Sequence, residues 1–207
     1  RTGRAIVMAG RRQPAEVHAL CHWINYMLHA PIDLIKPIDP VAAGNIASLR
    51  ALSQEISAGE VQNLIVLADN PVYDAPGDLN LGDAIASVPF SAHLALYDNE
   101  TSARCKWHLP LSHPLESWSD LRSFDGTASI VQPLIRPLYD TRTAHQLIAL
   151  VAGSLATSSY ELVRGTWKNG QQSEAGGGDF DSWWRQTLQD GVVADSAAQP
   201  ASIGAPM

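Results

Sequence analysis

Two loops in the middle of the chain carry residues that could bind a ligand. Each loop follows a short apolar run, residues 64–68 and residues 93–96, of the kind that a buried parallel strand requires. In an open α/β sheet, ligands bind beyond the carboxyl ends of the strands, so polar loops after two neighbouring strands mark one candidate site. The residues that we assign to this site are Asp69, Asn70, Pro71, Glu100 and Thr101.

A second candidate site lies in the loop before the helix that we expect to begin near Pro14. A helix N-terminus offers free backbone amides, and guanidinium groups add positive charge, so Arg11 and Arg12 could bind an anion there. Solvent-exposed loop arginines without a ligand are the alternative. The usual glycine-rich motifs of nucleotide-binding proteins are missing from the sequence.

Metal-binding residue types are present but form no familiar pattern. His18 and His22 have the spacing of two ligands on one helix face, but no third ligand stands at an obvious spacing. Cys21 and Cys105 match none of the Cys-x-x-Cys patterns of zinc or iron–sulfur sites. We therefore expect this chain to supply no metal site and no cofactor of its own.

Composition limits the class of protein. The chain has 207 residues, of which 45% are hydrophobic and 17% charged, as a globular α/β domain requires. A net charge of −7 argues against nucleic acid, which is usually met by a basic surface. No apolar run approaches the roughly 20 residues of a membrane span, so we expect any membrane association to come through partners. Because the sequence starts at Arg1 without a leader, we expect an internal or processed piece of a longer protein.

The order of elements predicts an α/β fold with a mainly parallel, Rossmann-like sheet and helices on both faces. Its expected strands are residues 5–9, 64–68 and 93–96, separated by helical segments as βαβ units require. Further predictions are a strand at residues 129–131 and helices that begin near Pro14, Asn45, Asp78, Thr143, Ser158 and Phe180.

Three parts are expected along the chain. Residues 1–153 form the Rossmann-like domain, residues 154–191 a helical appendage with a glycine-rich linker at 169–178, and residues 192–207 a mobile tail. In the first helix, spacing places Leu20 and Met27 on the buried face and Asn25 on the polar face.

Several segments, in a fixed order, carry a family resemblance. The chain resembles the molybdopterin oxidoreductase family, and more closely the large iron–sulfur, molybdopterin-enzyme-like subunit of bacterial alternative complex III. The resemblance runs from about Gly3 to Val193 through NPVYDAP, VPF, ETSARCKWHLP, LESWSD, DGTASIVQPLI and FDSWWRQTLQDGV.

This resemblance implies a place in a quinol-oxidising electron-transfer complex on the periplasmic side of the bacterial inner membrane. Implied partners are the other domains of the subunit and subunits that carry iron–sulfur and haem centres. In the family, a molybdenum bis(pterin guanine dinucleotide) cofactor is bound, and Asp69, Asn70 and Thr101 stand where its guanine nucleotide is contacted. Asn70 suits a base edge, because an amide both donates and accepts.

Two functions remain open. In the first, this stretch is a scaffold or docking segment, and electrons pass through centres elsewhere. In the second, it is the cofactor-clasping domain of a true molybdopterin oxidoreductase. Asp69 favours the scaffold, since a carboxylate repels a diphosphate, and so does Lys106, which stands where the family usually has aspartate.

Overall fold

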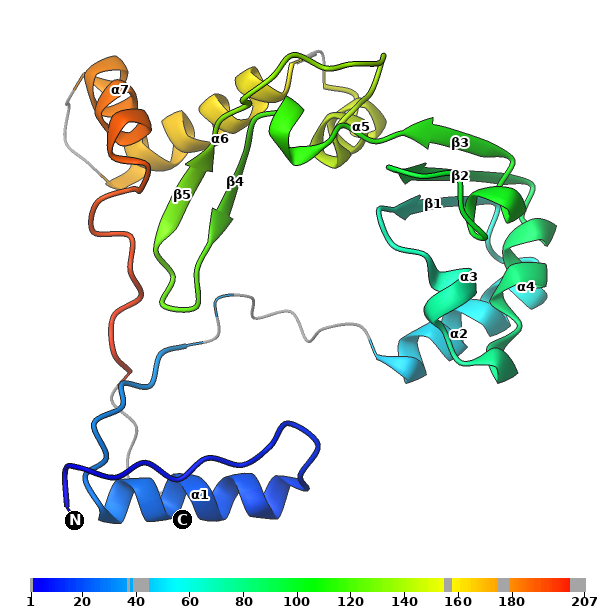
Figure 1. The fold of residues 1–207 in the computed structure, drawn as a ribbon. Helices are drawn as coiled ribbons and strands as arrows, with labels where there is room; N and C mark the ends of the chain where they lie inside the picture. The colour runs from blue at the N-terminus through cyan, green and yellow to red at the C-terminus, as the bar shows by residue number, and fades with distance from the viewer. Residues whose placement is uncertain (1, 37, 39–44, 155–157, 175–178, 202–207) are drawn as a thin grey trace. The chain divides into compact units, whose positions relative to one another are not determined.

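The chain divides into two compact units. The computed structural model describes residues 2–36, 38, 45–154, 158–174 and 179–201. The first unit comprises Arg1–Pro40, Arg122–Thr127 and Asp195–Met207, and the second comprises Val41–Leu121 and Ala128–Ala194 (Figure 1). The expected domain boundaries at residues 153 and 191 stay predictions.

The second unit contains a three-stranded parallel sheet, which confirms a mixed α/β fold. Its strands are β1 (Asn63–Leu67), β2 (Phe90–Ala95) and β3 (Trp107–Pro110), in the order β1-β2-β3. The central strand β2 is buried from Ser91 to Ala95, which explains why its sequence does not alternate between apolar and polar residues. The Rossmann-like assignment and the helices on both faces stay predictions. Strand β3 was not expected, because it is short and ends in proline.

Two helices pack against each other near this sheet, α2 (Ile46–Ser57) and α4 (Leu81–Ser87) (Figure 1). Asn45 caps α2 as predicted, since its Oδ1 accepts from the Ser48 amide at 3.0 Å. The predicted cap of α4 at Asp78 is wrong. Asp78 lies in the 3-10 turn Gly77–Leu79 and pairs with Arg50, and the left-handed Asn80, with φ of 44°, separates this turn from α4.

The second unit also contains the short helix α3 (Pro71–Asp74), a strand pair of which Arg122 lies in the first unit, and three longer helices. The strand pair and the longer helices are β4 (Ser119–Arg122), β5 (Ala128–Val131), α5 (Ala144–Val151), α6 (Ser159–Glu174) and α7 (Phe180–Asp190). The cap of α5 by Thr143 and the capping box of Ser158 with Glu161 are confirmed. The linker predicted from residue 169 is wrong as far as Glu174, where α6 ends, and residues 175–178 lie outside the described residues. The core of this part consists of Ala128, Ile130, Val163, Trp184 and Val193.

The first unit contains α1 (Ala15–Met27), but the strand expected at residues 5–9 is absent. This segment runs beside α1 without joining a sheet (Figure 1). The Asn25 side chain accepts from the Val7 amide at 2.7 Å and donates to the Val7 carbonyl at 2.8 Å. The strand prediction is therefore wrong for a physical reason: a ladder needs a second strand, and here a helix side chain stands in that place.

The orientation predicted for α1 is wrong in part. Asn25, expected on the exposed face, is only 7% exposed, whereas Leu20, Trp23 and Met27 are exposed. Asn25 turns toward residues 5–9 because the backbone of Val7 needs a hydrogen-bond partner. Cys21, Ile24 and Leu28, from the apolar face, are half-buried.

The C-terminal residues are held by backbone hydrogen bonds as far as they are described. The Val193 amide donates to Ala128 at 2.8 Å in the second unit, and the Ala198 amide donates to Asp125 at 2.6 Å in the first. Gly126, with φ of 88°, allows this approach, because a Cβ there would lie 2.9 Å from the Ala198 nitrogen. The mobility of the tail stays a prediction. Among the described helices, none combines the length and apolar character needed to cross a bilayer.

Candidate functional site

The two candidate loops lie side by side, as their places in the sequence predict. β1 and β2 are parallel neighbours, so residues 69–78 and 98–104 leave the sheet at the same edge. Asn70 Nδ2 donates to Glu100 Oε2 at 2.8 Å, and the Val72 amide donates to Thr101 Oγ1 at 3.1 Å. The structure thus brings together Asn70, Pro71, Glu100 and Thr101.

Asn70 is the centre of this contact, and both ends of its amide group are used. Its Oδ1 accepts from the Thr101 hydroxyl at 2.8 Å and from the Thr101 amide at 3.2 Å. The bond from Asn70 lowers the pKa of the Glu100 carboxyl below its usual value, and the backbone amide of Glu100 adds to this effect. Thr101 is fully buried. Asn70 and Thr101, two of the three residues expected to contact a nucleotide, therefore bond to each other.

The turn that leaves β1 is left-handed at a residue other than glycine. Ala68 has φ of 65°, a region that L-residues with a Cβ rarely occupy. Its amide still donates to the Leu94 carbonyl at 2.8 Å, so the backbone continues the sheet for one more residue before it turns. This turn directs the Asp69 carbonyl toward β2.

A buried histidine network, which the sequence analysis missed, lies under the two loops. His93 on β2 is fully buried, and its Nε2 donates to the Asp69 carbonyl at 2.9 Å. Ser102 Oγ lies 2.8 Å from His93 Nδ1 and 2.9 Å from His108 Nδ1. Because His93 Nε2 carries a proton, neutral His93 accepts from Ser102 at Nδ1, and the hydroxyl in turn accepts from His108. A histidine within an apolar run was the available signal, since a buried polar side chain needs partners.

Burial lowers the pKa of His93 below the ordinary histidine value of 6.5. The bond to the Asp69 carbonyl opposes this shift, and the neighbouring His108 adds to it. The lowered pKa favours the neutral form of His93, in which it links the Asp69 loop to β2 by a hydrogen bond and does not act as a general acid.

Arg11 and Arg12 belong to the first unit, whereas the two loops belong to the second. Both arginines are exposed and lie in a turn closed by the Gln13 amide, which donates to the Gly10 carbonyl at 3.0 Å. Their assignment to an anion site stays a prediction.

Within the described residues, no group of three or more His, Cys, Asp or Glu side chains is arranged to hold a metal ion. His18, Cys21 and His22 do line a cavity of about 310 Å³ between α1 and residues 6–9. Neither Cys21 nor Cys105 forms a disulfide, and burial raises the pKa of the Cys105 thiol, an effect that a bond to Ser91 opposes.

The larger of the cavities described in the second unit is not at the two loops. A space of about 230 Å³ lies between Pro71 and Arg104, but one of about 580 Å³ lies beside α5 and α6, lined by Ser112, Glu116, Arg142 and Gln146 among others. From their position at the sheet edge we expected the loops to form the main concave surface, but they line only the smaller of these two cavities.

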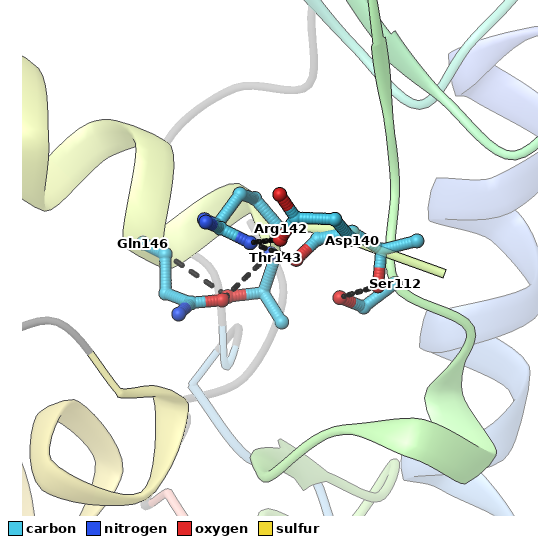
Figure 2. A network of polar contacts seen from close by, with 6 residues as sticks. Ser112, Asp140, Arg142, Thr143 and Gln146 are labelled. Atoms are coloured by element: carbon cyan, nitrogen blue, oxygen red, sulfur yellow. Dashed lines mark hydrogen bonds and ion pairs between the residues drawn. The ribbon is translucent and has the colours of Figure 1, made fainter. Parts of the chain in front are cut away.

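The polar groups around this larger cavity are bonded to each other (Figure 2). Ser112 and Thr141 share a hydrogen bond of 2.8 Å, and Arg142 pairs with Asp140. Gln146 Oε1 accepts from the amide and the hydroxyl of Thr143 at 2.9 and 3.0 Å, which closes the N-terminus of α5. Figure 2 therefore shows a network that fixes the chain between β3 and α5.

Comparison with known proteins gives a similarity to a curated protein. No family model matches the chain. The chain is 28% identical over 143 residues to the menaquinone reductase, molybdopterin-binding-like subunit, of Nitratidesulfovibrio vulgaris strain Hildenborough. The match covers 65% of this chain and 19% of that protein, so the chain spans about a fifth of the length of its relative. The similarity supports a molybdopterin-oxidoreductase-like family, the class that the sequence motifs indicate.

Proposed function

We propose that this chain is a segment of a molybdopterin-oxidoreductase-like subunit and acts mainly as a scaffold and docking domain of an electron-transfer complex. The similarity to a molybdopterin-binding-like subunit of a menaquinone reductase supports the family and a link to quinones. Quinol oxidation, as in alternative complex III, is the reaction that the motifs favour for the assembly.

The observation that carries the scaffold role is the state of Asn70. A guanine edge would need an amide oxygen to accept and an amide nitrogen to donate, and both atoms of Asn70 already bond within the protein. Freeing them would leave the buried Thr101 hydroxyl with one partner fewer, a cost of about 1–3 kcal/mol for an unsatisfied group. The residues present thus fit a brace between two loops better than a nucleotide site.

Charge supports the same conclusion. Asp69 and Glu100, one from each loop, place two exposed carboxylates at the sheet edge. A diphosphate near them would be repelled. Arg104, at the end of the second loop, is already paired with Asp83 at 3.3 Å. We propose no chemical step for this chain.

The proposed partners are the other domains of the subunit and iron–sulfur and haem-containing subunits that carry the electrons. We propose the periplasmic side of the inner membrane as the location, on the resemblance of the motifs.

A cofactor-clasping domain is the second candidate, and one feature favours it. The two loops leave neighbouring parallel strands at one edge, which is where α/β sheets bind nucleotides. In that case the loops would bind the guanosine half of a molybdenum bis(pterin guanine dinucleotide) cofactor, which supplies the redox chemistry.

Metal analysis of the purified whole protein separates the two candidates. The scaffold role predicts molybdenum well below one atom per polypeptide, in protein from cells grown with ample molybdate. An active molybdoenzyme purified from the same cells is the control for cofactor supply. Molybdenum at one atom per polypeptide would contradict the scaffold role.

A further inference from the structure

The imidazole rings of His93 and His108 share one hydroxyl group. Ser102 Oγ lies 2.8 Å from His93 Nδ1 and 2.9 Å from His108 Nδ1, and the two ring centroids are 6.3 Å apart. The surroundings of the rings differ, because His93 on β2 is fully buried, whereas His108 on β3 is exposed. A change of charge at the exposed ring therefore reaches the buried ring through a single oxygen atom.

Three hydrogen bonds hold the neutral arrangement together. The Asp69 carbonyl can only accept, so His93 Nε2 donates to it at 2.9 Å. Neutral His93 then accepts at Nδ1, and the hydrogen of the Ser102 hydroxyl goes there. The same oxygen accepts from Nδ1–H of His108, which leaves the Nε2 atom of His108 without a hydrogen.

One added proton fits this arrangement. On His108 it binds at Nε2, and no bond changes, since Nδ1–H of that ring already donates to Ser102. On His93 it would bind at Nδ1, which requires the Ser102 hydroxyl to turn and donate to a neutral His108. Burial opposes a charge on His93, so the first proton resides on His108.

A second proton does not fit. With both rings charged, each Nδ1 carries a hydrogen, and the Ser102 hydroxyl has no ring nitrogen left to which it can donate. The two positive charges also lie on rings whose centroids are 6.3 Å apart, and the neighbouring His108 lowers the pKa of His93. Charging both rings therefore breaks the bond that Ser102 donates to His93.

The other titratable groups on the neighbouring elements have their own partners or lie outside this contact. Strand β1 has no titratable side chain, and Asp69 meets His93 with its carbonyl, while its carboxylate is exposed. Around Ser102 and β3, Arg104 pairs with Asp83, Lys106 Nζ donates to the Ala86 carbonyl, and the Cys105 thiol bonds to Ser91. Within the described residues, the charge that acts on His93 is thus that of His108.

We propose that His93, Ser102 and His108 form a two-proton switch for the second loop, residues 98–104. The first proton, on His108, leaves this loop bonded to β2 through Ser102. The second proton, on His93, releases the loop, because the Ser102 hydroxyl loses its acceptor. The loop therefore stays closed in mild acid and opens only in more acidic solution.

An NMR titration of the whole protein, labelled with 15N-histidine, tests the order of the two protons. His93 should stay neutral while His108 charges, and should charge itself about one pH unit or more lower, a tenfold difference in proton affinity. His93→Gln and His108→Asn identify the two sets of signals. Charging of both rings at the same pH, or of His93 first, would overturn the proposal.

A pair of variants separates the link through Ser102 from general charge. His108→Asn keeps an amide donor for Ser102 but takes up no proton, so His93 should charge at a pH at least about 0.5 unit higher, a threefold change in proton affinity. Lys106→Gln removes a positive charge two residues away and leaves this link intact, so it should shift the titration of His93 clearly less. No shift in His108→Asn, or an equal shift in Lys106→Gln, would overturn the proposal.

Hydrogen exchange reports the opening of the loop. The Val72 amide donates to Thr101 Oγ1, beside Ser102, at 3.1 Å. Its protection should be unchanged while His108 charges and should fall at least about tenfold as His93 charges. Protection that falls with the first proton, or that persists after the second, would overturn the proposal.

Discussion

Two segments for which we predict strands have different structures in this protein. Strand β2 lies between β1 and β3 and is buried from Ser91 to Ala95, whereas residues 5–9 lie beside one helix and form no ladder. Hydrophobicity does not explain the difference, since residues 5–9 are entirely apolar, whereas β2 contains Ser91 and His93 and is nevertheless the buried segment. The difference lies in the neighbouring segments. β-propensity describes how well a side chain fits a pleated surface, and only β2 has a paired strand on each side.

The polar side chains of the two regions also have different partners. In β2, His93 is buried and held by groups of its own unit, the Asp69 carbonyl and Ser102. In the first unit, the Asn25 side chain bonds to the backbone N–H and C=O of Val7, as a neighbouring strand would. Apolar residues of α1 are exposed there. In β2 the backbone bonds to neighbouring strands, whereas at Val7 a helix side chain takes that place.

Truncation in the complete sheet should have the largest effect. Leu94 is fully buried at the centre of β2, so Leu94→Ala should destabilise the protein by about 2–5 kcal/mol. Leu134→Ala, at a side chain that is 77% exposed, is the control and should change stability by less than about 0.5 kcal/mol. Chemical denaturation measures both. Similar effects of the two substitutions would show that β2 is not the core that we describe.

Removal of the Thr101 hydroxyl should have the next largest effect. Thr101→Val keeps the shape but leaves the Val72 amide without its partner and Asn70 Oδ1 with one bond fewer, a cost of about 1–3 kcal/mol. Thr101→Ser retains the hydroxyl and should lose clearly less. If the two variants unfold at the same denaturant concentration, the hydroxyl does not brace the loops.

The two hydrogen bonds between Asn25 and Val7 in the first unit should contribute somewhat less to stability. Asn25→Ala removes two hydrogen bonds from Val7, but water can reach this partly exposed segment, so we expect a loss of about 1 kcal/mol and faster exchange of the Val7 amide. His22→Ala, one turn earlier at an exposed position of α1, is the control. An unchanged exchange rate of the Val7 amide in Asn25→Ala would remove the evidence that α1 substitutes for a strand.

Acid should weaken the histidine network. Burial lowers the pKa of His93 in the folded protein, while in the unfolded chain it returns to 6.5, so below pH 6.5 the unfolded state binds more protons. Stability is therefore full above pH 6.5 and falls as the pH drops toward the folded-state value. His93→Gln should flatten this dependence, though not abolish it, because burial also lowers the pKa of His145. A thermal midpoint that is constant from pH 8 to pH 5 in the unchanged protein would contradict this assignment.

Glycine at the turn after β1 should give the smallest effect. Ala68→Gly relieves the left-handed strain of about 1–2 kcal/mol but adds flexibility to the unfolded chain, so a net gain of at most about 1 kcal/mol is expected. Ala84→Gly, inside α4, should instead destabilise by about 0.5–1 kcal/mol. Opposite signs in thermal melts are the result that supports the turn geometry.

Local chemistry made part of this structure predictable. Asn45, Thr143 and Ser158 cap helices as their side chains suggest, and the apolar runs before Asp69 and Tyr97 become neighbouring strands. The juxtaposition of Asn70 and Thr101 followed from parallel pairing. These features depend on a few residues near one another in sequence.

Other features depend on neighbours that local sequence does not reveal. The fate of residues 5–9 is decided by the missing second strand, and the direction of α1 by the need to pair Val7. The use of Asn70 within the protein depends on Glu100, thirty residues away, and could not be told from nucleotide binding by residue type. A polar group suited to a ligand is equally suited to a neighbouring loop.

Calorimetric titration of the whole protein with GDP tests the scaffold role most directly. Because Asn70 is already bonded and Asp69 repels a diphosphate, the account predicts a Kd in the millimolar range, or about −4 kcal/mol. Asp69→Gly should improve binding modestly, by removing that repulsion. Micromolar affinity in the unchanged protein would contradict the account and restore the cofactor-clasping domain.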